Sequence, residues 1–332
     1  MAAKSALTPG TAKTLKHNKW GSGEIKRHLA FLTMLLPGLV FLFCFSYMPM
    51  PALVLAFKRY QLATPPADYW IQNRFIYSLF IDNEWVGFSN FEYIFNTPDA
   101  AMVLRNTLGY NIVFMVLGLI LSVALAIMVN ELRNRILAKV YHTILFMPYF
   151  ISWIIVAYVV YAFVSANGVF NQWLKALGQN TINFYSSPQY WPFIFVFCNI
   201  WKYTGNNSII YLATLTGFDQ ELYEAAAIDG AGKWRQFFSI TIPLITPVIF
   251  YNLVTQLCSA FQEFNSAYII TQGGPLGSTT LISLLVYQNA FKSYEMGLAC
   301  AMAWLLFLIV AVFSLVAFLS QKYWVYYSDD ER

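Results

Sequence analysis

Six long apolar stretches dominate this sequence, and none of them contains more than one charged side chain. Only 11% of the 332 residues are charged, whereas a soluble domain carries roughly 25%. A chain with so little charge cannot cover a surface that faces water, which excludes a soluble enzyme or a nucleic-acid-binding domain. The sequence therefore predicts an all-α, multi-pass membrane protein.

The six stretches are each long enough for a transmembrane helix, which needs about 20 apolar residues. The first is too long for a signal peptide and lacks a cleavage pattern, so we interpret it as a retained anchor. The four cysteines lie in apolar segments without metal-ligand spacing, so no metal site is predicted. Together the spans form a transmembrane domain of residues 29–321, and they are predicted at residues 29–57, 106–130, 143–164, 190–216, 243–271 and 296–321.

Basic residues near the ends of the spans predict the orientation in the membrane. With the N-terminus inside the cell, 13 basic residues lie on the cytoplasmic side and six lie outside. Both termini are therefore predicted to be cytoplasmic. Residues 1–28 form a basic tail that we expect to be mostly disordered, and residues 322–332 form a second cytoplasmic tail.

The cytoplasmic loop of residues 218–242 is longer and more acidic than an ordinary connector. Asp219 is a plausible helix N-cap, and Gly230 is expected to end that helix. Trp234 and Phe237 then recur at helical spacing. Two short helices joined by a glycine are typical of a segment that docks into a groove on a partner protein. A helix that lies on the lipid headgroups would have the same pattern.

This loop resembles a known signature. Glu224, Ala225 and Ala226, followed by Gly230 and then by residues 240–243 (ITIP), resemble the EAA motif of permease subunits of binding-protein-dependent ABC importers. Residues 223–231 resemble in particular the maltose-type sugar permeases, with Ile242 in place of the more usual leucine. Weaker similarities extend the resemblance over residues 85–321, and they lie at residues 86–91, 106–108 and 271–275.

The resemblance implies a type I ABC-importer permease in a bacterial inner membrane. Such a chain forms half of a sugar pathway and is not an enzyme, because ATP and Mg are bound by partner ATPase subunits and this chain binds no cofactor. The implied partners are a second permease in a heterodimer, two cytoplasmic ATPases, an extracytoplasmic solute-binding protein, the sugar and membrane lipid, but no nucleic acid. The implied ATPase-docking positions in the coupling helix are Glu224, Ala225, Ala226, Asp229, Gly230, Trp234 and Phe237.

Polar side chains inside the spans are candidates for the substrate pathway, because lipid cannot satisfy them. A stripe of four lies along the fifth span, although interhelical hydrogen bonding would explain it equally. Lys202 and Glu263 have similar predicted depths, so an ion pair between them could form, but the sequence leaves that pairing open. The candidates are Asn252, Gln256, Ser259, Glu263, Tyr149, Trp153, Asn199, Lys202, Asn206 and Asn207.

Three other functions remain open at this stage. The same architecture could carry another polar solute, or the chain could be an ATP-independent secondary carrier or a membrane-embedded enzyme. No cluster of His, Asp, Ser or Cys supports an enzyme. Residues 230–233 (GAGK) lack the further glycine and the Ser or Thr of a phosphate-binding loop.

Overall fold

The computed structural model describes residues 22–60, 68, 73, 76–78, 83–260 and 263–326. The predicted tails at residues 1–21 and 327–332 lie outside the described residues, as does most of the segment of residues 61–82. The chain divides into two compact units, Met1–Ala52 and Leu53–Arg332, and each is considered by itself.

The first unit is an apolar helix with its side chains exposed. It contains α1 (Ser22–Leu42) and the π-helical segment η1 (Phe43–Tyr47). A turn then leads into the 3-10 helix η2 (Met50–Phe57), so the helix type changes within the stretch in which a span is predicted at residues 29–57. Pro49 and Pro51 explain the change, because proline has no backbone N–H to continue an α-helix. Met34 is 80% exposed, and such apolar surface is typical of contact with lipid.

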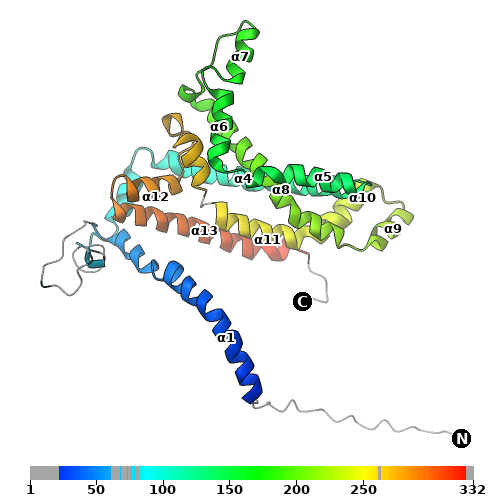
Figure 1. Cartoon of the computed structure of the whole chain (residues 1–332), viewed down its shortest axis with the longest axis horizontal. Coiled ribbons are helices and arrows are strands. Elements are labelled where there is room, and N and C mark those ends of the chain that lie inside the picture. The colour runs from blue at the N-terminus through cyan, green and yellow to red at the C-terminus, as the bar shows by residue number, and fades with distance from the viewer. Residues whose placement is uncertain are drawn as a thin grey trace. The chain divides into compact units, whose positions relative to one another are not determined.

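The second unit is a bundle in which α4, α8, α11 and α13 pack against one another (Figure 1). Apart from an isolated bridge between Lys58 and Trp85, the described regular structure is helical, which confirms the all-α prediction. The helices are α3 (Ser89–Asn96), α4 (Ala100–Asn130), α5 (Arg135–Phe146), α6 (Trp153–Val164), α7 (Val169–Ala176), α8 (Trp191–Thr216), α9 (Gln220–Ile228), α10 (Lys233–Gln236), α11 (Ile242–Ala260), α12 (Ile282–Phe291) and α13 (Met296–Trp324).

Within the described residues, five segments are long and apolar enough to cross a membrane. Helix α8, the predicted fourth span, has 26 residues but is not among them, because it contains Lys202 and three asparagines. The count of six spans and the orientation therefore stay predictions. The five segments are Phe31–Phe57, Ala100–Asn130, Trp153–Ala176, Lys233–Ser259 and Met296–Trp324.

The predicted third span, residues 143–164, is broken. Helix α5 ends at Phe146, the 3-10 helix η3 (Met147–Phe150) follows, and α6 begins at Trp153 in a different direction (Figure 1). Pro148 removes a backbone donor, and the Ser152 hydroxyl caps α6 by accepting from the Ile155 N–H at 3.4 Å. The predicted span of residues 143–164 is therefore not one continuous helix.

The predicted fifth span, residues 243–271, is also interrupted. Helix α11 ends at Ala260, Glu263 and Phe264 are not helical, and the π-helical segment η7 (Ala267–Thr271) follows. Glu263 therefore does not continue the stripe of α11, although the sequence spacing had predicted that it would.

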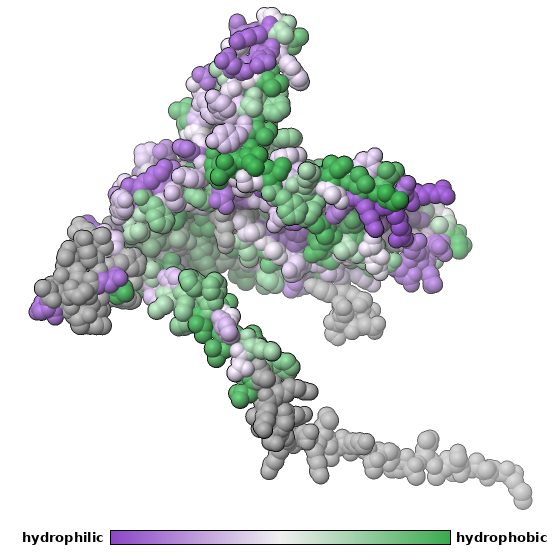
Figure 2. Space-filling model, in the orientation of Figure 1, coloured by the Kyte–Doolittle hydropathy of each residue, from purple (hydrophilic) through white to green (hydrophobic). Residues whose placement is uncertain are grey.

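Packing between α4 and α8 forms the centre of the second unit. Phe195 and Tyr211 of α8 are fully buried, and the rings of Phe114 and Phe195 lie 5.5 Å apart. The Ser122 hydroxyl of α4 donates to the Thr204 carbonyl at 3.3 Å. Figure 2 shows hydrophilic surface at α7 and at the end that carries α9 and α10, with hydrophobic surface between them. Polar surface thus gathers at the ends of the unit.

Candidate functional site

The loop of residues 218–242 folds as a helix, a glycine turn and a second helix. Asp219 caps α9 by accepting from the Glu221 N–H at 3.1 Å, as expected from the sequence. Gly230 has a φ of 77°, a left-handed conformation that favours glycine. The Ala231 N–H donates to the Ala226 carbonyl at 2.9 Å, which closes the end of α9.

Helix α9 presents a mixed apolar and acidic surface at one end of the bundle (Figure 1). Ile228 is 86% exposed and Trp234 is 77% exposed. The Tyr223 hydroxyl lies 3.1 Å from the Thr241 hydroxyl, which ties α9 to the π-helical segment η6 (Phe237–Thr241) ahead of α11. Of the predicted docking positions, Ala226 and Phe237 are half-buried, and the exposed ones are Glu224, Ala225, Asp229, Gly230 and Trp234.

A cavity of about 250 Å³, which we call the polar cavity, lies among α4, α8 and α11. It brings together side chains that are far apart in the sequence. Asn252 is not in its wall but accepts a hydrogen bond from the Gln256 amide at 3.0 Å. The predicted pathway residues in the wall are Tyr149, Asn199, Asn206, Gln256, Ser259 and Glu263.

Lys202 does not line the polar cavity. Its ammonium group donates to the carbonyls of Tyr149, at 2.9 Å, and of Pro148 and Ile151. The side chain is only 5% exposed, and its nitrogen lies 5.4 Å from the ring centre of Trp153. Lys202 thus satisfies the carbonyl groups at the break between α5 and α6.

The ion pair between Lys202 and Glu263, which the sequence left open, is not formed in the described structure. Within the described part of the chain, ion pairs join Arg59 to Glu84 and Lys233 to Glu131. Glu263 instead accepts a hydrogen bond from the Ser266 hydroxyl at 2.7 Å. Similar depth alone could not decide the pairing, because the free carbonyl groups of the broken helix bind the Lys202 ammonium group instead.

Sequence reasoning missed several wall residues, among them Tyr203 and Thr204 of α8, whereas Asn207 was a candidate and lies in the wall. A signal was available, since Asn199, Tyr203 and Asn207 are spaced four residues apart and share a helix face. The ring of Tyr203 lies 6.2 Å from that of Tyr149. The Nδ2 atom of Asn199 is buried and has no hydrogen-bond partner among the described residues, so it is an available donor at the cavity.

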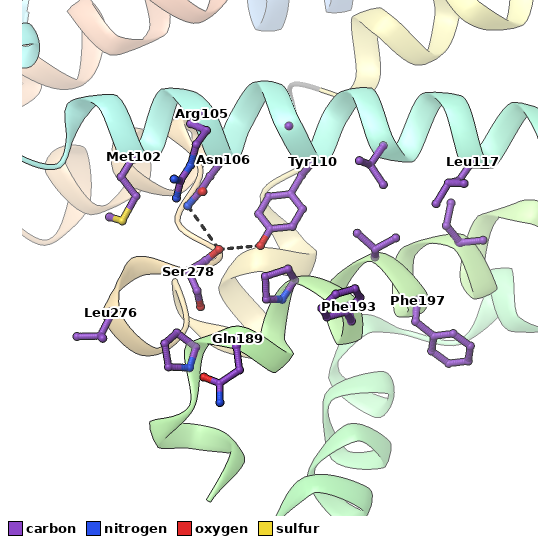
Figure 3. A pocket seen from close by; sticks show the side chains of 16 residues that line it. Met102, Arg105, Asn106, Tyr110, Leu117, Gln189, Phe193, Phe197, Leu276 and Ser278 are labelled. Atoms are coloured by element: carbon purple, nitrogen blue, oxygen red, sulfur yellow. Dashed lines mark hydrogen bonds between the residues drawn. The ribbon is translucent and has the colours of Figure 1, made fainter.

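A larger and mostly apolar groove of about 1040 Å³ lies between α4, α8 and the glycine-rich turn after η7 (Figure 3). Asn106 donates to the Gly277 carbonyl at 2.9 Å, and the Tyr110 hydroxyl donates to the Ser278 carbonyl at 2.7 Å. The left-handed φ of Leu276, 51°, is unusual for a residue other than glycine. These bonds hold the turn against α4.

Comparisons with known proteins agree with this architecture. Residues 118–325 match the model of the family described as binding-protein-dependent transport system inner membrane component. The probable ABC transporter permease protein YesP of Bacillus subtilis is 32% identical over 313 residues, which cover 92% of this chain and 95% of that protein. The lactose transport system permease protein LacF of Rhizobium radiobacter is 30% identical, with 71% of this chain and 80% of that protein covered.

Solved structures are similar as well. A crystal structure of a bacterial alginate ABC transporter, in complex with a periplasmic protein that holds an alginate pentasaccharide, contains a chain with a TM-score of 0.76 and 29% identity. The match covers 90% of this chain and 96% of that one. The sequence similarity, the shared fold and the matched family model agree: this chain belongs to the family of inner membrane components of binding-protein-dependent transport systems.

Proposed function

We propose that this chain forms half of the translocation pathway of an ABC importer for a sugar, specifically an oligosaccharide. The observation that carries the proposal is α9, an exposed acidic helix closed by the left-handed Gly230 at one end of the bundle. Relatives named for lactose, for polygalacturonan and rhamnogalacturonan, and for alginate transport support a carbohydrate. A relative named for sn-glycerol-3-phosphate keeps another polar solute as the second candidate.

The coupling step would begin at α9. Glu224 would pair with a base on the ATPase, and the small Ala225 would allow close approach of the two proteins. Movement of α9 would reach η6 through the contact between Tyr223 and Thr241, and η6 continues directly into α11. Helix α11 carries Gln256 and Ser259 in the wall of the polar cavity, so closure of the ATPase would change that cavity.

The polar cavity has the chemistry that a sugar needs. Asn199, Asn206 and Gln256 offer amide groups, and Glu263 offers a carboxylate that accepts hydrogen bonds from hydroxyls. Tyr149 and Tyr203 add aromatic surface, against which sugar CH groups pack. A cavity of about 250 Å³ is small for an oligosaccharide, which agrees with a pathway completed by a second permease.

The remaining partners complete the transporter. Two cytoplasmic ATPases would bind ATP and Mg, and a solute-binding protein outside the membrane would deliver the sugar. The family description, with its inner membrane component and binding-protein dependence, supports this set. The bacterial inner membrane is accordingly the proposed location.

The test is co-purification of this chain with its ATPase after Glu224→Lys. The exchange removes a charge-assisted contact and adds repulsion, so we expect the amount of ATPase retained to fall about tenfold or more, together with sugar uptake. The matched control is Glu92→Lys, the same exchange at an exposed position of α3. Gly230→Pro is expected to act like Glu224→Lys, because proline cannot adopt a φ of 77°. Normal ATPase binding and uptake in both variants would contradict the assignment of α9.

The variant Asn199→Leu tests whether the Asn199 side chain contacts the substrate or stabilises the fold. The variant removes a buried amide whose nitrogen has no hydrogen bond within 3.5 Å but interacts with the Glu263 carboxyl, so the melting temperature of the purified chain is expected to change little. Uptake is expected to fall about tenfold, the value of one hydrogen bond to the sugar. The contrasting variant is Asn171→Leu, because the buried Asn171 amide makes hydrogen bonds to Ser165 and Ile182 and its loss lowers stability. Normal uptake by Asn199→Leu would contradict the assignment of Asn199 to the substrate pathway.

A further inference from the structure

A second polar pocket lies away from the polar cavity, between the turn that joins α4 to α5 and the loop of residues 218–242. We call it the basic pocket. Its volume is about 690 Å³, and its wall includes Arg133, Arg135, Lys139 and His142. Tyr223 of α9 belongs to the same wall. Of this wall, the proposed transport cycle uses Tyr223 and none of the basic residues.

The charge of the basic pocket is not neutralised from within. Glu131 is the single acid among the described residues of its wall, and it is paired with Lys233 at 3.1 Å. Within the described part of the chain, Arg133, Arg135 and Lys139 make no ion pair. Three cations around one cavity produce a positive potential that attracts an anion.

An unsatisfied buried atom also points to a ligand. His142 Nε2 is buried and has no hydrogen-bond partner among the described residues, although its ring lies parallel to that of Phe146 at 6.3 Å. Native proteins rarely leave such an atom without a partner. Helix α5 begins at Arg135, so the positive end of its dipole also lies at the wall of the pocket.

The neighbouring surface of α5 is apolar. Ile136, Val140 and Ile144 are spaced four residues apart and are 73%, 47% and 58% exposed, so they form one stripe. The basic side chains Arg135 and Lys139 line the pocket on a neighbouring face of the same helix. Figure 2 shows hydrophobic surface over α5 beside hydrophilic surface at the end that carries α9 and α10. A free anion would contact only the basic side chains, whereas a phospholipid would also pack its acyl chains against the apolar stripe.

We propose that the basic pocket binds the phosphate of an anionic phospholipid, with the acyl chains along Ile136, Val140 and Ile144. The arginines and Lys139 pair with the phosphate oxygens, and His142 Nε2 forms a hydrogen bond with the headgroup. The predicted cytoplasmic side is the side on which anionic lipids attract basic segments. Because α5 and Tyr223 of α9 share this wall, bound lipid would brace α9 against α5.

The binding test uses the full-length chain in detergent and does not depend on which solute is transported. Native mass spectrometry would measure binding of dihexanoyl phosphatidylglycerol, of dihexanoyl phosphatidylcholine and of inorganic phosphate, each alone. We expect phosphatidylglycerol to bind at least tenfold more tightly than the other two. Equal binding of the two lipids would overturn the proposal, and phosphate binding as tight as phosphatidylglycerol would replace the lipid with a soluble anion.

The residues are tested by a triple variant, Arg133→Gln with Arg135→Gln and Lys139→Gln. Each basic residue near a surface contributes roughly fivefold in affinity, so the triple variant should bind phosphatidylglycerol about a hundredfold more weakly. Lys322→Gln is the matched control, because Lys322 lies in the last turn of α13 and outside the pocket. If the triple variant does not fold, Arg135→Gln alone should weaken binding about fivefold. Unchanged affinity in the folded variant would refute the site.

Discussion

Replacing Gly205 with alanine is expected to destabilise this chain by about 3 kcal/mol or more and to prevent assembly of the transporter. Gly205 lies in α8 where the end of α5 crosses it. A Cβ atom there would meet the Leu145 carbonyl group, 2.5 Å from its carbon, and would lie 2.9 Å from the Phe146 nitrogen. These are backbone atoms, so no side-chain rotation relieves the overlap, and α5 must separate from α8.

Size-exclusion chromatography and thermal unfolding of the purified chain would measure this effect. Gly109→Ala is the matched control, because Gly109 lies in α4 and a Cβ atom there would have no other atom within 4 Å. The control should be neutral or slightly stabilising, since alanine favours a helix by about 1 kcal/mol over glycine. If Gly205→Ala unfolds at the temperature of the control, α5 and α8 are not held in this close contact.

Replacing Lys202 with methionine is expected to cost about 3 kcal/mol of stability. The change keeps an unbranched side chain only one atom shorter but removes the donor to the carbonyls of Pro148, Tyr149 and Ile151. A buried group left without its partner costs roughly 1–3 kcal/mol, and three carbonyls are affected. The measurement is thermal unfolding in detergent, with Lys175→Met at an exposed position of α7 as the control.

Glu263→Gln distinguishes this role of Lys202 from an ion pair with Glu263, which the sequence left open. A glutamine keeps an acceptor for the Ser266 hydroxyl, so stability should change by less than about 1 kcal/mol. If Glu263→Gln and Lys202→Met were equally destabilising, the two side chains would act as a pair. In that case the assignment of Lys202 to the helix break would be wrong.

The structural features that the sequence predicted correctly are those determined by residues within a single helical turn. Asp219 and Gly230 define the ends of α9, because a capping side chain and a left-handed glycine act within one turn. The interruptions of the third and fifth predicted spans were missed, because an apolar stretch has the same hydropathy whether its helix continues or bends. Pro148 and Ser152 were the available signals for the first of these breaks.

Part of the wall of the polar cavity follows from the helical spacing of polar residues in the sequence. Gln256 and Ser259 share a face of α11, as their spacing requires, and both line the polar cavity. Glu263 reaches the same cavity from a non-helical segment beyond α11, which no periodicity predicts. Trp153 and Lys202 were placed in the pathway by their polarity or aromaticity, whereas the structure places them at the helix break.

The polarity of α8 has a consequence for biogenesis. A lysine at the centre of a helix opposes insertion by roughly 2.5–3.5 kcal/mol, and Asn199, Asn206 and Asn207 add to that penalty. The partners that satisfy Lys202 belong to residues 148–151, which leave the ribosome before α8 does. Helix α8 is therefore a segment that the translocon would retain until the earlier helices stand beside it, so that the order of synthesis is itself part of how this chain enters the membrane.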